Sequence, residues 1–246
     1  MRRLVLFLSL FLMSLPAMAA GGLADVRITE VATGRSLPVY QSGGQRYVAG
    51  RPGAEYRITV RNRSGAELLA VVSVDGVNVV SGETAAVSQG GYVIGRRGSI
   101  SIAGWRKSLD HVAAFYFSDA VDAYATRTGR PDHVGVIGVA LFKRKPDPAV
   151  ELLQRERRAE SGATGDSAAR SAAPQAAEKS IGTGHGRHQD APARYVEFER
   201  ESDAPNELIV IHYDTHANLV ARGVIRQPRL PSPFPGGFVA DPPDRG

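Results

Sequence analysis

The chain contains no cysteine among its 246 residues, and this absence removes several chemistries at once. Without disulfides the fold must be stabilised by a hydrophobic core, and thiol nucleophiles and thiolate metal sites are excluded. A serine nucleophile on a strand-to-helix turn is not indicated, because no G-x-S-x-G sequence occurs. His111, His133 and the scattered aspartates also show no recognisable order with a serine.

Long hydrophobic runs are missing too, apart from one at the N-terminus. Arg2 and Arg3 precede a nearly apolar run at positions 4–15, and Ala17-Met18-Ala19 follows as a small-residue cleavage pattern. The run is shorter than the ~20 residues that span a bilayer, although a short membrane anchor is the alternative. We expect residues 1–19 to be a Sec-type signal peptide, so that the mature chain is periplasmic or secreted and has no transmembrane segment.

The excess of charge of one sign is small as well. Loss of the two N-terminal arginines lowers the formal net charge from +5 to +3. No cluster of lysine and arginine is interleaved with aromatic residues, as is typical of nucleic-acid-binding surfaces. Nucleic acid is therefore not expected as a partner.

The chain is instead rich in short apolar segments separated by turns. Residues 56–61 alternate apolar and polar side chains, which is typical of a half-buried strand. Residues 68–74 are nearly all aliphatic, which indicates a strand covered on both faces. Asp75-Gly76 and Ser42-Gly43-Gly44 are typical of the turns of β-hairpins.

The pattern continues to about residue 145. Residues 92–94 and 100–102 predict a further hairpin, and 112–117 and 134–142 predict two more strands. Residues 118–129 predict one short helix that ends at a glycine. Many short strands and a single helix predict an all-β domain at residues 20–145, an immunoglobulin-like or jelly-roll-like β-sandwich.

The composition changes after the predicted sandwich. Residues 146–190 are mostly alanine, serine, glycine and charged residues, which predicts a flexible linker. Within 191–226, two alternating segments at 194–201 and 207–213 predict a β-hairpin, followed by a short helix. An isolated hairpin is marginally stable, so we expect this unit to dock on the sandwich or to extend one of its sheets. Residues 227–246 predict an extended, proline-rich tail.

Three possible metal ligands alternate in the sequence HYDTH. His212, Asp214 and His216 would share one face if a strand continues through them, and His185 and His188 could complete a zinc site. The alternative is that Asp214 caps a helix over THANLVAR, ended by the glycine that follows, which would point His216 elsewhere.

Two further patterns each have a functional and a structural explanation. The glycines of GTGHGR, residues 182–187, could cradle a phosphate that Arg187 pairs with, or they form a turn at the end of the linker. Glu197, Glu199 and Glu201 suggest the carboxylates of a glycoside hydrolase, but three of them on one strand are more simply a solvated face.

The single tryptophan is a candidate for ligand binding. Trp105 is followed by Arg106, and it could stack on a sugar if Tyr92, Tyr116 and Tyr124 join it in an exposed patch. The alternative is that Trp105 belongs to the core of the sandwich or to its rim.

Several segments together resemble a group of uncharacterised exported proteins of proteobacteria. These segments are VDGVNVVSGE, GYVI, GWRKS and VGVIGVALF, followed by GTGHGR and YVEFERE. They cover the predicted sandwich and the C-terminal hairpin and skip the linker and the tail. The resemblance implies a two-part secreted or periplasmic protein and carries no established activity.

The sequence favours a periplasmic or cell-envelope binding module without catalytic activity or cofactor, with an envelope protein or a glycan as partner. The alternative is a metal-binding protein or metal-dependent hydrolase that holds zinc with the C-terminal histidines. These hypotheses differ in geometry, because zinc requires the two histidine pairs to converge on one point at about 2.0–2.2 Å.

Overall fold

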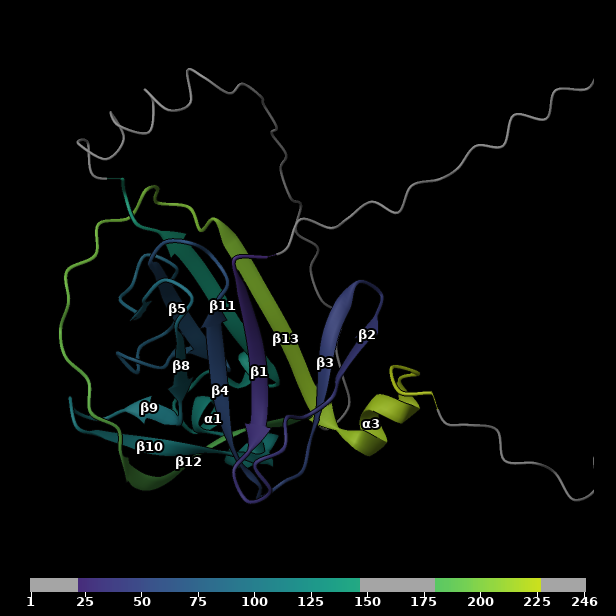
Figure 1. Ribbon diagram of the computed structural model, residues 1–246. Coiled ribbons are helices and arrows are strands. Elements are labelled where there is room, and N and C mark those ends of the chain that lie inside the picture. Colours follow the sequence, from purple (N-terminus) through teal and green to yellow (C-terminus); the bar gives the residue numbers. More distant parts are fainter. Residues whose placement is uncertain (1–21, 147–179, 227–246) are drawn as a thin grey trace, which may run out of the picture.

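The computed structural model describes residues 22–146 and 180–226, which form two packed β-sheets (Figure 1). The strands of the first sheet are β1 (Ala24–Glu30), β4 (Glu55–Asn62), β8 (Ser99–Ile102), β9 (Gly104–Arg106), β10 (His111–Asp119) and β12 (Ile181–Asp190). Those of the second are β2 (Val39–Ser42), β3 (Gln45–Gly50), β5 (Leu68–Val74), β6 (Val77–Asn78), β7 (Tyr92–Ile94), β11 (Val136–Lys143) and β13 (Glu207–Thr215). The prediction of an all-β sandwich is confirmed.

Three predicted regions lie outside the described residues. They are the signal peptide at 1–19, the linker as far as residue 179, and the tail at 227–246. Within the two described ranges, no helix has the length and apolar character needed to cross a membrane.

The first sheet has the order β1-β4-β10-β12, with β8 beside β4 and β9 beside β10. The second has the order β2-β3-β13-β11-β5-β6, with β7 beside β5. Neighbouring strands are antiparallel except β13 and β3, which are parallel. The alternation of β4 places Tyr56, Ile58 and Val60 in the core between the sheets. Burial of one such side chain contributes about 1.5–3 kcal/mol.

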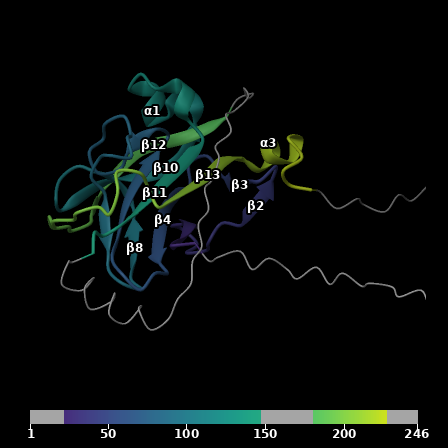
Figure 2. The same cartoon turned by 90° about the horizontal axis from the view of Figure 1, so that it is seen from above.

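Within residues 22–146 and 180–226, four short helical turns lie at the ends of strands. Between β10 and β11 the chain forms η1 (Ala120–Asp122), α1 (Tyr124–Arg127) and η2 (Pro131–His133), and α1 packs against β12 (Figure 2). α3 (His216–Ala221) follows β13 and lies beside β3. Gly129 has φ +84° directly after α1, so the predicted glycine stop is confirmed.

Two predicted hairpins are confirmed and a third is wrong. Asp75 and Gly76, with φ of +52° and +70°, join β5 to β6, and the turn at 43–44 joins β2 to β3. However, β7 pairs with β5 and β8 pairs with β4, so residues 92–94 and 100–102 belong to different sheets. The Asn62 side chain stabilises this crossing by donating hydrogen bonds to the Ile94 and Gly95 carbonyls.

The predicted linker is too long at its C-terminal end. Residues 181–190 are β12, which pairs with β10 along its length and has buried residues at 181–184. Its glycines are needed because neighbouring groups occupy the space of a side chain. A Cβ on Gly184 would lie 2.1 Å from the Tyr116 ring, and one on Gly186 would lie 2.7 Å from the Ala114 carbonyl oxygen.

The predicted C-terminal hairpin is also wrong. Residues 207–215 are β13, which lies inside the second sheet between β3 and β11 and is part of the sandwich. Residues 194–201 form no strand, and the β-bridge that they form with a described residue joins Arg200 to Arg144 at the end of β11. The chain must pass from β12 in one sheet to β13 in the other, so it crosses the edge of the sandwich instead of folding back on itself.

Candidate functional site

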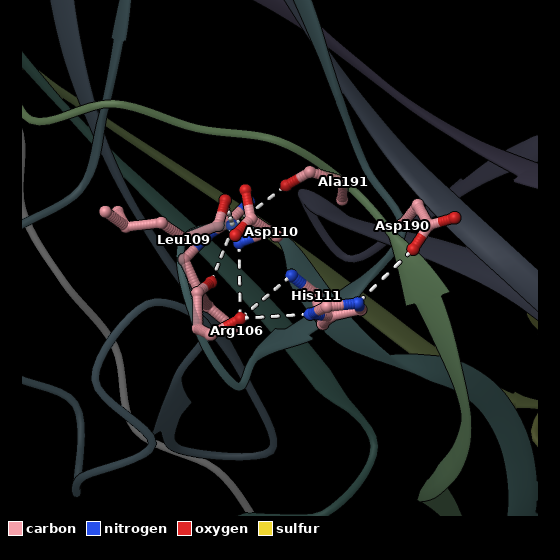
Figure 3. Close-up of polar contacts among 7 residues, drawn as sticks. Arg106, Leu109, Asp110, His111, Asp190 and Ala191 are labelled. Carbon is pink, nitrogen blue, oxygen red and sulfur yellow. Dashed lines mark hydrogen bonds and ion pairs between the residues drawn. The ribbon is translucent and has the colours of Figure 1, made fainter.

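The segment that crosses this edge, residues 191–201, is called the strap here. Its first end is fixed to the turn between β9 and β10 (Figure 3). The amides of Ala191 and Ala193 donate to the carbonyls of Asp110 and Leu109, at 2.6 and 2.7 Å. Arg106 adds a hydrogen bond from Nη1 to the Ala191 carbonyl at 2.9 Å.

The second end of the strap is fixed to the end of β11. The Lys145 amide donates to the Glu199 carbonyl at 2.9 Å, and Arg144 Nη2 donates to the Glu197 carbonyl at 2.9 Å. Arg200 extends from the strap to three consecutive carbonyls, those of residues 87–89, and its guanidinium lies 4.1 Å from the centre of the Phe142 ring.

The middle of the strap is not fixed by hydrogen bonds as the two ends are. Arg194, Tyr195 and Val196 form no hydrogen bond with any other described residue, and Tyr195 is 89% exposed. The strap is therefore an arch with two fixed ends and a free centre.

A groove of about 950 Å³ lies between the strap and the sandwich. It is bordered by consecutive residues of two strands, Tyr92–Val93 of β7 and Ile100–Ile102 of β8. Side chains alternate between the faces of a strand, so consecutive residues border one groove only along a strand edge. Among the described strands, β8 has β4 on one side only and β7 has β5 on one side only.

The charged groups around the groove are mainly cationic. Arg106, Arg144, Arg194 and Arg200 border it, against the single carboxylate of Glu67. Glu67 pairs with Arg144 at 2.9 Å, whereas Arg106 and Arg200 form no ion pair with a described carboxylate. Partial burial lowers the pKa of the Arg200 guanidinium, although the nearby Asp203 raises it. The groove therefore favours an anionic ligand.

His111 and Asp190 meet beside the first end of the strap (Figure 3), and Ser108 lies beside His111. Ser108 Oγ lies 3.2 Å from His111 Nδ1, and His111 Nε2 lies 3.4 Å from Asp190 Oδ1. Sequence reasoning missed this set, because His111 and Asp190 are far apart in the chain and are joined only by the pairing of β10 with β12.

The hydrogen bonds of Ser108 are those of a serine that stabilises a turn. Ser108 Oγ already accepts hydrogen bonds from the amides of Asp110 and His111, at 3.2 and 3.1 Å, as serine does in local turn motifs. The Asp190 side chain is 93% exposed, whereas the aspartate that orients a catalytic histidine is buried. The set therefore does not resemble a preorganised nucleophile.

The predicted zinc ligands are not brought together. His185 and His188 lie on β12 in the first sheet, His212 and Asp214 lie on β13 in the second, and His216 begins α3. Across residues 22–146 and 180–226, no group of three or more histidine, aspartate or glutamate side chains has metal-binding geometry. The alternation that suggested the site ends where α3 begins.

The HYDTH residues have structural contacts instead. The His212 ring lies 5.5 Å from the Tyr47 ring, and burial lowers its pKa. Asp214 is buried and accepts hydrogen bonds from the Thr215 amide and the Asn218 side chain, at 2.7 and 2.8 Å. The helix cap is Thr215, one residue after the predicted Asp214.

The other candidate residues have separate outcomes. GTGHGR is part of β12, so the phosphate loop is wrong, and Arg187 pairs with Glu55 through two hydrogen bonds of 2.9 and 3.2 Å. Glu197, Glu199 and Glu201 are exposed, as expected of a solvated face. The Arg187 side chain is 62% exposed in this ion pair, which makes it a surface contact.

The three predicted ligand-binding residues, Trp105, Arg106 and Tyr92, do not lie in one site. Trp105 is buried in the core, where its ring lies 4.8 Å from Phe115 and 4.9 Å from Tyr124. Arg106 and Tyr92 border the groove, and Arg106 Nε donates to the Tyr92 hydroxyl at 3.2 Å. An aromatic platform for a sugar around Trp105 is therefore not formed.

A buried chain of polar groups joins the two sheets away from the groove. Asp75 accepts hydrogen bonds from the Tyr213 hydroxyl at 2.6 Å and from the amides of Gly135 and Thr183, at 2.9 and 2.7 Å. Because Tyr213 donates to Asp75, the Thr183 hydroxyl donates to Tyr213 and the Tyr56 hydroxyl donates to Thr183. Burial raises the pKa of Asp75 to about 6, although these hydrogen bonds lower it.

Known proteins give no further assignment for this site. Comparison with protein-family models, with curated proteins and with solved structures finds no match to the chain.

Proposed function

We propose that this protein is an exported, non-catalytic binding module of the periplasm or cell envelope, and that the groove under the strap binds an anionic ligand. The observation that supports this most is the groove itself, a hollow of about 950 Å³ with an excess of arginines. Pockets of 300–1,000 Å³ are typical of ligand sites.

The strap adds to the support for binding. Its two ends are fixed by arginine side chains and backbone pairs, while Arg194, Tyr195 and Val196 remain free to contact a ligand. A site that is largely preformed, with a few adaptable side chains, loses less conformational entropy on binding.

Export is supported by the N-terminal sequence and by the resemblance to exported proteobacterial proteins. N-terminal sequencing of the chain from the periplasmic fraction tests it, and the expected first residue is Ala20. A chain that stays in the cytoplasm with Met1 intact would contradict export without affecting the groove.

Binding is tested with two anionic probes of different classes on the purified mature chain. The probes are oligogalacturonate and a blocked peptide of alternating valine and glutamate, about six residues long. We expect at least one to shift the backbone amide NMR signals of residues 92–102 and 191–200, and a peptide of valine and lysine not to.

The matched variants reverse one charge each. Arg194→Glu in the groove is expected to weaken binding, whereas Arg46→Glu, an exposed change on β3 away from the groove, leaves it unchanged. Failure of both anionic probes to shift the groove signals of the folded chain would overturn the proposed function.

A further inference from the structure

The backbone of β8 has a free edge that points into the groove. The Asn62 amide donates to the Gly98 carbonyl, and in an antiparallel pair hydrogen-bonded residues alternate with unbonded ones. With the observed register, Val60 pairs with Ile100 and Ile58 with Ile102 through hydrogen bonds. The amides and carbonyls of Ser99 and Ser101 therefore point away from β4.

The other strand of the pair supports this assignment. The Arg63 amide donates to the Leu23 carbonyl, so odd-numbered residues of β4 bond to β1 and even-numbered ones bond to β8. Ser101 is exposed, borders the groove and forms no other hydrogen bond with a described residue. An edge of this kind is a template for another strand.

The neighbouring edge of β9 already forms a hydrogen bond on its outward side. The Arg106 amide, which also points away from β10, donates to the Val79 carbonyl at 2.8 Å. The outward edge is therefore occupied at β9 and has no partner among the described strands at β8, and Ser101 of β8 borders the same groove as the free centre of the strap.

We propose that the groove takes an acidic peptide in extended conformation, which adds as a strand to the free edge of β8. This inference rests on the proposed function and specifies its ligand. Hydrogen bonds to Ser99 and Ser101 provide the backbone contacts, and the arginines around the groove attract the acidic side chains. A peptide fits better than a glycan because Trp105 is in the core, so it cannot stack on a sugar.

The first test removes one amide from the edge without changing the ladder to β4. Ser101→Pro deletes the outward N–H, and proline is tolerated on an edge strand where that group faces away from the sheet. Ser101→Ala keeps the N–H and is the matched control. We expect Ser101→Pro to weaken binding of the valine–glutamate peptide about tenfold, and Ser101→Ala to change it less than about twofold.

The second test leaves the protein unchanged, so it holds even if Ser101→Pro fails to fold. In an extended peptide the amides of alternate residues point to opposite edges. We compare two N-methylated peptides, one methylated at every valine and one at every glutamate. One of them is expected to lose about tenfold in affinity while the other retains most of it.

The outcomes separate the two proposals. Binding of oligogalacturonate without the peptide, or equal affinity of both methylated peptides, would overturn strand addition and leave the proposed function standing. Unchanged binding to a folded Ser101→Pro chain would overturn strand addition as well. Failure of both anionic probes would overturn both proposals.

Discussion

At the scale of single residues, Asp75 makes the stability of the fold depend on pH. Burial raises its pKa from 3.8 to about 6, so the folded chain binds this proton more tightly than the unfolded chain. The stability from this group is full below about pH 4 and is lost as the pH rises through 6. The change corresponds to about 3 kcal/mol in the free energy of unfolding.

The measurement is denaturant unfolding of the wild type and Asp75→Asn between about pH 4 and 7. Asp75→Asn is less stable at every pH, because its amide nitrogen faces the donating Thr183 amide. The difference in stability between the wild type and Asp75→Asn is expected to shrink by about 2 kcal/mol over this pH range. Asp132→Asn, at an exposed position, serves as the control, and a constant difference for Asp75→Asn would contradict the prediction.

The two tyrosines of the buried chain are expected to differ in effect. Tyr213→Phe removes a donor from the Asp75 carboxylate and the acceptor of the Thr183 hydroxyl, and should cost about 2–3 kcal/mol. Tyr56→Phe removes only the last donor of the chain and should cost about 1 kcal/mol. Equal losses of stability in denaturant unfolding would show that the hydroxyl groups do not donate in the order Tyr56, Thr183, Tyr213 toward Asp75.

Sequence predicts the turn at Asp75 but not the role of its carboxylate. Asp75-Gly76 is a local signal, because both residues adopt positive φ. The burial of the side chain depends on Thr183 and Tyr213, which come from distant strands. Arg106 and Tyr92 are candidate site residues by their local sequence. The groove that they share with the strap could not be predicted, because it also depends on segments that are distant in the sequence.

At the scale of elements, the strap depends on Arg200. Arg200→Ala removes hydrogen bonds to three carbonyls and the contact with Phe142, so the second end should open more often. We expect hydrogen exchange of the Lys145 and Glu201 amides to become about tenfold faster. Arg194→Ala, which removes no such contact, is expected to leave both amides unchanged, and so is the control.

The glycines of β12 provide a second prediction at this scale. Gly184→Ala places a Cβ 2.1 Å from the Tyr116 ring and should destabilise the fold by about 1–3 kcal/mol. Tyr116→Ala removes the obstructing ring, so the double variant should lose less than the sum of the two single losses. Additive losses in thermal unfolding would mean that the ring does not cause the strain.

These glycines also explain why β12 could not be recognised from sequence. At positions 182, 184 and 186 the segment has glycine in place of the branched and aromatic residues that mark strands, and at 184 and 186 this is because Tyr116 and Ala114 of the neighbouring strand fill the space. β4 and β5 were predictable because their own side chains carry the alternation or the aliphatic run. The prediction of a hairpin strand in the strap was wrong because no partner strand covers Tyr195 and Val196, which are exposed.

At the scale of the whole molecule, the sandwich is completed only by the C-terminal part of the chain. β13 lies between β3 and β11, and without it β2 and β3 lose their connection to the rest of the sheet. Ile209, Ile211 and Tyr213 of β13 are all buried in the core. The loss of three such side chains, at about 1.5–3 kcal/mol each, is comparable with the 5–15 kcal/mol that stabilises a typical domain.

Residues 22–146 alone are therefore expected not to unfold cooperatively, although sequence predicted an independent sandwich at 20–145. Adding residues 180–226 as a separate chain should restore a cooperative thermal transition, because β12 and β13 can then pair with β10 and with β3 and β11. Residues 180–206, which lack β13, are the control and should not restore it. A cooperative transition of residues 22–146 alone would show that β12 and β13 are additions to a complete core, in which case the strap would join two peripheral strands instead of the two sheets.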